Sequence, residues 1–134
     1  MKKIFFPYKI YKKESYPIIK ILMEGPDGPL ETEAYVDTGA SISIFQTAIA
    51  SDLGIDYSKG KVSYTMVGDG GFIPVYVHTI PMRIGHVRFP ARIGFSPSLG
   101  ADFNLLGQKD IFDRFVVSFD RRKKIVSFQP YRRQ

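Results

Sequence analysis

The sequence predicts an all-β fold with one or two short helices. Turn signals recur along the 134 residues, and no long stretch shows the apolar periodicity of a helix. Apolar residues make up 44% of the chain and include 11 Phe, enough to build a hydrophobic core. The chain shows no internal repeat, linker or low-complexity tract. We therefore expect one domain over residues 1–134.

In the first half, strands are expected to alternate with turns and one short helix. The apolar run at 16–22 predicts a strand. Leu30–Val36 alternates polar and apolar side chains, as a half-buried strand does. A short strand is expected at Ile42–Phe45. Two helical turns should follow over Gln46–Leu53, ended by Gly54 as the C-terminal glycine.

The pattern in the second half of the sequence predicts three hairpins and a second helix. The paired strands are expected at 62–67 with 72–77, at 80–84 with 87–93, and at 116–119 with 125–128. Residues 108–115 predict a helix, because Ile111, Phe112 and Phe115 would share one of its faces.

Composition excludes several kinds of chemistry. The chain has no cysteine, which excludes disulfides, thiolate catalysis and cysteine-based zinc sites. His78 and His86 match no ligand spacing, so we expect neither a metal nor a cofactor. No stretch approaches the roughly 20 apolar residues that span a bilayer, and the N-terminal residues lack the apolar region of a signal peptide. We expect a soluble, cytoplasmic protein without a membrane partner.

Charge is unevenly spread, with a net value of +6. Both ends are basic, whereas residues 21–60 carry seven acids and one Lys. One interpretation is nucleic-acid binding through six basic residues, namely Arg121, Arg122, Lys123, Lys124, Arg132 and Arg133. The alternating run Ile125–Phe128 separates these residues, which places them in a hairpin turn and a tail. Nucleic acid is therefore the disfavoured partner.

Residues 35–41, Tyr-Val-Asp-Thr-Gly-Ala-Ser, are the most informative segment. An apolar strand runs directly into the carboxylate of Asp37, which is costly to bury unless it is paired or protonated. Thr38 supplies a hydroxyl, and Gly39 lets another backbone approach closely. This arrangement predicts a functional carboxyl.

Three features stand in order along the chain: Asp37-Thr38-Gly39-Ala40-Ser41, the Gly-Asp-Gly-Gly run at 68–71, and Asn104-Leu105-Leu106-Gly107. Each alone is weak evidence, but together in one small all-β domain they are specific. The chain resembles the retropepsin-like aspartic proteases, single-domain relatives of pepsin that include retroviral and stand-alone bacterial members. The resemblance covers roughly residues 16–130. It implies a closed or partly open acid-protease β-barrel.

The resemblance assigns roles to the first motif. Asp37 would be catalytic, and Thr38 would lock two active loops together by hydrogen bonds. Gly39 would accept a substrate amide at its carbonyl. Ser41 would support the carboxylate from behind.

The other two motifs would form the substrate cleft and its backing. The hairpin around residues 67–72 resembles a flap that closes over substrate. Substrate-binding residues would be Ala40, Val67, Gly68, Asp69, Gly70, Gly71 and Phe72, with Ile42 and Ile73 as further candidates for apolar pocket walls. Leu105, Leu106 and Gly107 resemble the run that passes behind the active loop. Gln108-Lys109 departs from the Arg-Asp or Arg-Asn that usually follows this glycine.

The chemistry implied needs two carboxyls. Two carboxylates about 3 Å apart share one proton, so that a general acid and a general base are present together. The chain has a single Asp-Thr-Gly, so the second carboxyl must be Asp37 of a second copy. We therefore expect a homodimeric endopeptidase acting on an extended peptide or protein. Its interface is expected to pair the segments 4–6 and 125–128.

A second function, binding without hydrolysis, also remains open. The Gln108-Lys109 departure is also compatible with a peptide-binding or dimerisation module of the same fold that does not hydrolyse its ligand.

Overall fold

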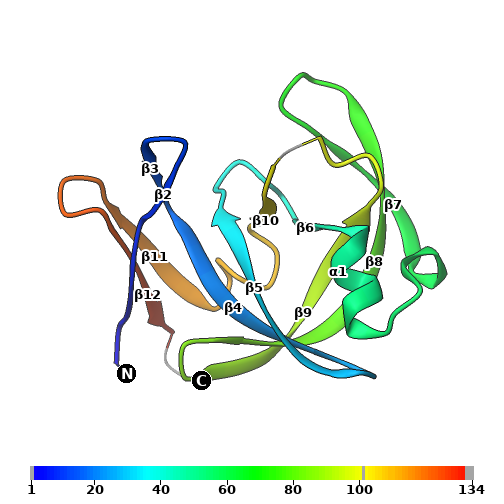
Figure 1. Ribbon diagram of the computed structural model, residues 1–134, viewed down its shortest axis with the longest axis horizontal. Coiled ribbons are helices and arrows are strands. Elements are labelled where there is room, and N and C mark those ends of the chain that lie inside the picture. Colours follow the sequence, from blue (N-terminus) through cyan, green and yellow to red (C-terminus); the bar gives the residue numbers. More distant parts are fainter. Residues whose placement is uncertain (1, 101, 132–134) are drawn as a thin grey trace.

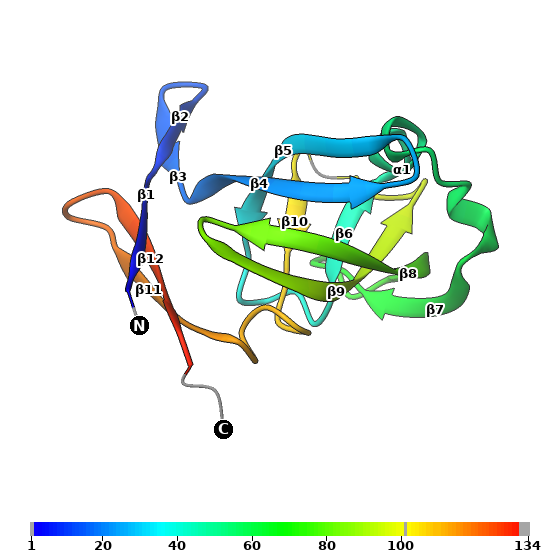
Figure 2. The same ribbon diagram turned by 90° about the horizontal axis from the view of Figure 1, so that it is seen from below.

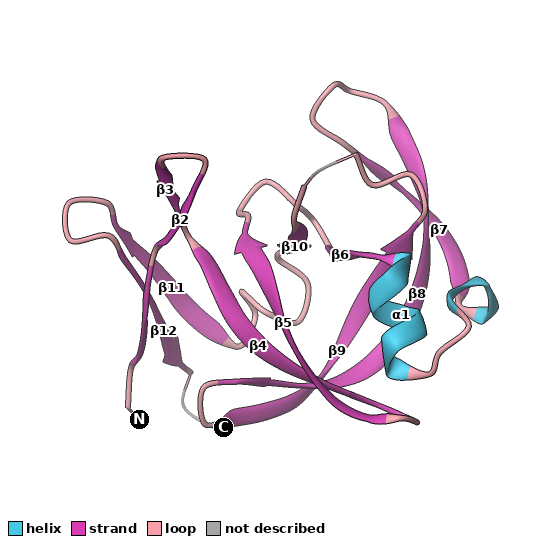
Figure 3. Cartoon of the chain, in the orientation of Figure 1, coloured by secondary structure: helices cyan, strands magenta, loops and turns pink. Residues whose placement is uncertain are grey.

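The computed structural model describes residues 2–100 and 102–131 and is mainly strand, as predicted (Figure 3). Seven strands form one large sheet in the order β4-β5-β10-β6-β9-β8-β7. A further pairing between β4 and β8 turns this sheet back on itself into a ring (Figures 1 and 2). Its strands are β4 (Ile18–Gly25), β5 (Gly28–Val36), β6 (Ser43–Gln46), β7 (Lys61–Met66), β8 (Phe72–Ile84), β9 (Val87–Ser96) and β10 (Asn104–Leu106).

Strand β10 connects the two halves of the sheet. It runs parallel to β5, with Leu106 opposite Val36, and antiparallel to β6, with Leu105 opposite Ile44. Residues 37–41, called the Asp37 loop below, follow β5 and lead toward β6. The end of β10 therefore lies directly behind that loop.

The core fills the inside of the ring. It includes side chains from strands that alternate buried and exposed positions, such as Ile19, Ile21 and Met23 of β4. Phe45 and Phe95, from the neighbouring strands β6 and β9, are fully buried. A sheet closed around such side chains gives its strands, and the loops between them, a fixed frame.

The predicted helix at 46–53 is confirmed as α1 (Thr47–Leu53). It ends at Gly54, whose φ of 83° is the left-handed conformation that glycine adopts without steric cost. A 3₁₀ turn follows at Tyr57–Lys59. His78 Nε2 lies 2.9 Å from the carbonyl oxygen of Tyr57, so this histidine anchors the 3₁₀ turn to β8.

Two of the predicted strands, 72–77 and 80–84, are one strand. β8 is 13 residues long and pairs with β7, β9 and β4. The polar residues His78 and Thr79 suggested a break between two hairpins. They instead pair with Ile93 and Arg92 of β9, so the ladder continues across them.

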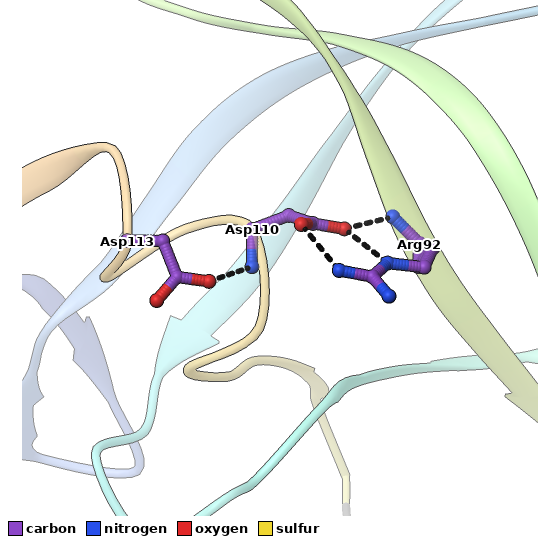
Figure 4. A network of polar contacts seen from close by, with 3 residues as sticks. All are labelled: Arg92, Asp110 and Asp113. Atoms are coloured by element: carbon purple, nitrogen blue, oxygen red, sulfur yellow. Dashed lines mark hydrogen bonds and ion pairs between the residues drawn. The ribbon is translucent and has the colours of Figure 1, made fainter.

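The predicted helix at 108–115 is wrong, because residues 109–114 form turns and Phe115 begins a strand. Asp110 has a φ of 67°, which interrupts any continuous helix. Its carboxylate accepts hydrogen bonds from the backbone N–H of Arg92 and from two guanidinium nitrogens of the same residue, each at 2.9 Å (Figure 4). Asp113 in turn accepts the Asp110 N–H at 3.0 Å. Contacts with β9 thus favour a turn over the helix that the apolar spacing suggested.

The two ends of the chain build a separate sheet. β1 (Ile4–Pro7), β12 (Ile125–Pro130) and β11 (Phe115–Asp120) are antiparallel in that order and lie beside the ring (Figure 2). A small hairpin of β2 (Lys9–Tyr11) and β3 (Glu14–Tyr16) precedes β4. The segments 4–6 and 125–128, which we expected at a dimer interface, pair with each other within the chain.

Gly107 crosses immediately behind the Asp37 loop. Its N–H donates to the buried hydroxyl of Ser43 at 2.9 Å. A Cβ on Gly107 would lie 2.6 Å from the carbonyl oxygen of Ile42 and 2.7 Å from that of Ala40. Both neighbours are backbone atoms, which cannot move aside as a flexible side chain can, so only glycine fits here.

The Arg92–Asp110 contact should make stability depend on pH. The Arg92 guanidinium lowers the pKa of Asp110 below its ordinary value. A lowered pKa stabilises the fold above the unfolded-state value of about 3.9, and this contribution is lost as the pH falls through the folded-state value. Asp110→Asn should therefore lower the free energy of unfolding by about 1 kcal/mol at pH 7. The difference from wild type should shrink below about pH 4.

Urea denaturation at a series of pH values measures this difference. Glu31→Gln is a matched control, because Glu31 is exposed and lies 4.0 Å from the exposed Lys20. A difference between wild type and Asp110→Asn that stays constant from pH 7 to pH 3 would contradict the prediction.

Gly107→Ala should destabilise the fold by about 3 kcal/mol, because the new methyl group would overlap backbone atoms. Gly68→Ala is the control, since a Cβ there meets nothing within 4 Å. That variant should stay within about 0.5 kcal/mol of wild type in thermal or chemical unfolding. Equal stability of the two variants would show that Gly107 is not sterically required.

Candidate active site

Asp37 is the first residue after β5. Its N–H donates to the carbonyl oxygen of Leu106 at 3.0 Å, which extends the β5–β10 pairing by one bond. Its Oδ1 accepts the N–H of Gly39 at 2.9 Å, and its carbonyl accepts the N–H of Ala40 at 3.3 Å. A Cβ on residue 39 would lie only 3.2 Å from Oδ1. The half-buried carboxylate is therefore oriented by its own tight loop.

The segment after β10 holds this loop from behind. The N–H groups of Gln108 and Lys109 donate to the carbonyl oxygens of Ala40 and Ser41, at 2.8 and 3.1 Å. The Gln108 side chain adds a bond from Nε2 to the carbonyl oxygen of Thr38 at 2.6 Å. Gln108, where the resemblance leads one to expect arginine, thus still contacts the loop.

Ser41 has a different contact from the one expected. Its hydroxyl lies 3.3 Å from the hydroxyl of Thr65 in β7, whereas the sequence led us to expect a contact with the Asp37 carboxylate. Thr65 is 8% exposed, so the pair is shielded on one side. Ser41 therefore connects the Asp37 loop to the hairpin of β7 and β8. Thr38 and Gly39 are exposed in the single chain.

Residues 67–71 form the tip of that hairpin. The Val67 N–H donates to the Gly71 carbonyl at 2.8 Å, and the Gly70 N–H donates to the Val67 carbonyl at 2.9 Å. The carboxylate of Asp69 accepts the Gly71 N–H at 2.8 Å. Gly70 has a φ of 86°, which the turn requires. Asp69 thus serves within the tip, as an acceptor for its backbone.

A cleft of about 570 Å³ lies between the Asp37 loop and this hairpin. It is lined by Asp37, Gly39, Ala40, Ser41, Ile44, Thr65, Met66, Val67, Gly68, Gly70 and Leu105. Predicted site residues from all three motifs therefore meet around one space. Leu106 and Gly107 are buried behind the loop, and Phe72 is 64% exposed opposite Met66 on β7.

A second hollow, of about 430 Å³, lies on the other side of Asp37. It is lined by Tyr8, Glu14, Ser15, Tyr16, Pro17, Tyr35, Val36, Asp37, Thr38, Phe119 and Arg121. The Tyr35 ring lies 6.1 Å from that of Tyr16 and is stacked at 5.8 Å on Phe103. Burial, and secondarily the Asp37 charge, raises the pKa of the Tyr35 hydroxyl.

Sequence reasoning missed the aromatic cluster that Tyr16 and Tyr35 of this lining form with Phe103. Tyr16, Tyr35 and Phe103 come from separate segments, and no spacing between them gave a signal. The Tyr11 ring completes the cluster at 4.8 Å from Phe103, which fixes the β2–β3 hairpin beside the site. The nearest available clue was Tyr35 itself, which stands two residues before Asp37.

The other predicted groups lie apart from the cleft lining. Residues 121–124 form the turn between β11 and β12, while Arg132 and Arg133 lie outside the described residues. His86 is exposed in the turn between β8 and β9. Within residues 2–100 and 102–131, no group of three or more His, Asp or Glu could hold a metal ion. In the same residues no helix is long and apolar enough to cross a membrane.

Comparison with solved structures finds the same fold elsewhere. A retropepsin-like aspartic protease from Rickettsia conorii superposes with a TM-score of 0.69 at 21% identity, covering 95% of this chain and 98% of the other. EIAV protease in complex with the inhibitor HBY-793 gives a TM-score of 0.54 at 22% identity, covering 78% of this chain and 93% of the other. No curated protein sequence matches significantly.

The sequence family described as aspartyl protease matches residues 23–108. This range is well over half of the chain and contains all three motifs. The fold agrees with the retropepsin-like structures above. The chain therefore belongs to the aspartyl protease family, and it has the fold of the retropepsin-like structures above.

Proposed function

We propose that this protein is a homodimeric aspartic endopeptidase. It hydrolyses peptide bonds through a water molecule activated by two Asp37 carboxyls, one from each subunit. The observation that carries the proposal is the cleft of about 570 Å³ in which Asp37 faces the glycine-rich hairpin tip. The family assignment supports the same chemistry.

The second carboxyl is assigned to the partner because the two other aspartates that stand beside or near glycines, Asp69 and Asp102, are engaged elsewhere. Asp69 accepts a backbone N–H within the hairpin tip, and Asp102 accepts the hydroxyl of Tyr11 at 2.9 Å. Neither lines the cleft with Asp37. Thr38 and Gly39 are exposed, which leaves the loop accessible to its symmetry mate.

In the proposed reaction, one carboxylate takes a proton from the bound water as the water attacks the peptide carbonyl carbon. The protonated carboxyl donates its hydrogen to the carbonyl oxygen. In the collapse of the tetrahedral intermediate, the carboxyl that took the water proton gives it to the leaving nitrogen, the other carboxylate takes a proton back from a hydroxyl of the intermediate, and the C–N bond breaks. The pair returns to its starting state with one shared proton.

The substrate is proposed to lie in the cleft as an extended strand. The carbonyl of Gly39 would accept a substrate amide, and the hairpin tip would cover the peptide and exclude water. The hydrogen bond from Gln108 to Thr38 supports catalysis over a non-hydrolytic binding module, since Gln108 still restrains the Asp37 loop.

Asp37→Asn should lower kcat/KM by about 1,000-fold or more, because the amide can neither accept nor donate the catalytic proton. Cleavage of a peptide library, followed by mass spectrometry across pH 4–8, measures this. The wild-type rate should have a bell-shaped pH profile with its maximum in mild acid. Asp102→Asn is the control and should remain active.

Two results would contradict the proposal. The first is full activity of Asp37→Asn. The second is binding of a statine-type transition-state analogue by the wild-type protein with no cleavage of any peptide, which would indicate the binding module instead.

A further inference from the structure

The hairpin of β7 and β8 extends beyond the rest of the large sheet. β7 is the last strand in the sheet order, so among the described strands it pairs with β8 alone. The ladder between β8 and β9 begins only at Tyr76, opposite Phe95. Residues 66–72, called the flap below, therefore project past the last strand that flanks the hairpin (Figure 1).

The flap is closed by its own hydrogen bonds. Its backbone bonds join Val67 to Gly71 and Gly70 to Val67, and the Asp69 carboxylate accepts the Gly71 N–H. A Cβ on Gly68 or Gly70 would meet nothing within 4 Å, so this part of the flap has open surroundings. The position of the flap is therefore decided where the hairpin leaves the sheet.

Two hydroxyl contacts hold the hairpin at that point, one on each strand. On β8, the buried Ser96 hydroxyl donates to the carbonyl oxygen of Pro74 at 2.7 Å. On β7, the hydroxyl of Thr65 lies 3.3 Å from that of Ser41. Pro74 stands opposite Tyr64, the residue before Thr65. The base of the flap is therefore fastened on both strands at nearly the same level.

The two contacts lead to different parts of the molecule. Ser96 belongs to β9, whereas Ser41 belongs to the Asp37 loop, where its carbonyl oxygen accepts the N–H of Lys109 at 3.1 Å. The contact between Ser41 and Thr65 thus joins the base of the flap directly to the loop that carries the Asp37 carboxylate. In the part of the chain that the structure describes, it is the only side-chain hydrogen bond that β7 makes.

Burial of Thr65 gives this contact its importance. Thr65 is 8% exposed, although its neighbours on either side along β7 are exposed. A buried hydroxyl without a partner costs free energy, so Thr65 favours the hairpin position in which Ser41 lies within reach. Both residues line the cleft of about 570 Å³, whose width depends on the distance between the hairpin and the Asp37 loop.

We propose that Thr65 is a positioning residue, which holds the flap at the distance from the Asp37 loop that substrate binding requires. Its hydroxyl acts through Ser41. Loss of the contact leaves a larger fraction of molecules with the flap displaced, and closing it on the substrate then costs affinity. This inference deepens the proposed endopeptidase activity and rests on it, although the contact itself can be measured without substrate.

Hydrogen exchange followed by mass spectrometry tests the contact in the protein without substrate. Thr65→Val keeps the shape of the side chain and removes the hydroxyl. The flap should then exchange about fivefold faster, the effect of losing one neutral hydrogen bond. Thr65→Ser keeps a hydroxyl and should stay within about twofold of wild type. Ser63→Ala is the control and should also stay within about twofold, because Ser63 is exposed on the same strand. Exchange over β12, in the terminal sheet, should not change in any variant.

A double-mutant cycle shows whether the two hydroxyls act together. Ser41→Ala should speed exchange of the flap as much as Thr65→Val does. The double variant should show no further increase, because both changes remove the same contact. Multiplied effects, of about 25-fold in the double variant, would contradict the contact.

Kinetics with a peptide substrate tests the positioning role. Thr65→Val should raise KM between about twofold and fivefold and leave kcat within about twofold, because the reaction proceeds only once the flap is closed. Thr65→Ser should restore KM. A fall in kcat at unchanged KM would overturn the positioning role.

Each outcome decides a different point. Equal flap exchange in Thr65→Val and Ser63→Ala would overturn the contact. Faster exchange over β12 as well as over the flap would indicate a general loss of stability and overturn the positioning role. Faster flap exchange with unchanged KM would overturn it too. Faster flap exchange in Thr65→Val, reversed in Thr65→Ser, in a protein that cleaves no peptide would keep the contact and contradict the proposed activity.

Discussion

The position of the Asp37 carboxylate depends on the backbone that passes behind its loop. Leu106 accepts the Asp37 N–H, while Gln108 and Lys109 donate to the loop's carbonyl groups. A tight turn whose polar groups are bonded to another backbone keeps its shape, because leaving them unpaired would cost free energy. This arrangement requires β10 to run between β5 and β6, and it requires glycine at position 107.

Much of the fold could be predicted because its signals are local. Alternation over Leu30–Val36, the helix stop at Gly54 and the glycines at 68–71 each act within a few residues. The turn at 108–115 could not be predicted in this way. Its left-handed residue, Asp110, is held by Arg92, which lies 18 positions earlier in the chain, and apolar spacing contains no information about that contact.

The candidate site likewise has a part that could be predicted from local sequence and a part that could not. The backbone of the Asp37 loop and of the hairpin tip follows from short motifs that specify turns, which places Asp37 and Gly39 facing that tip. The contacts between side chains in the site do not follow from such motifs. The contact between Ser41 and Thr65, and the stacking of Tyr35 on Phe103, join segments brought together only by the closed sheet. Partners across a sheet have no fixed separation in sequence, so motif reading cannot find them.

In the proposed homodimer each chain carries half of an acid pair, so the interface must be accurate to within one residue. A slip of one residue along paired strands moves a subunit by about 3.4 Å, as far as the roughly 3 Å that separates two carboxyls sharing a proton. Such a slip also moves every side chain of the strand to the opposite face of its sheet, so a strand with one buried face resists it. In the proposed dimer, the same interface that joins the subunits must therefore also fix the spacing of the two Asp37 carboxyls.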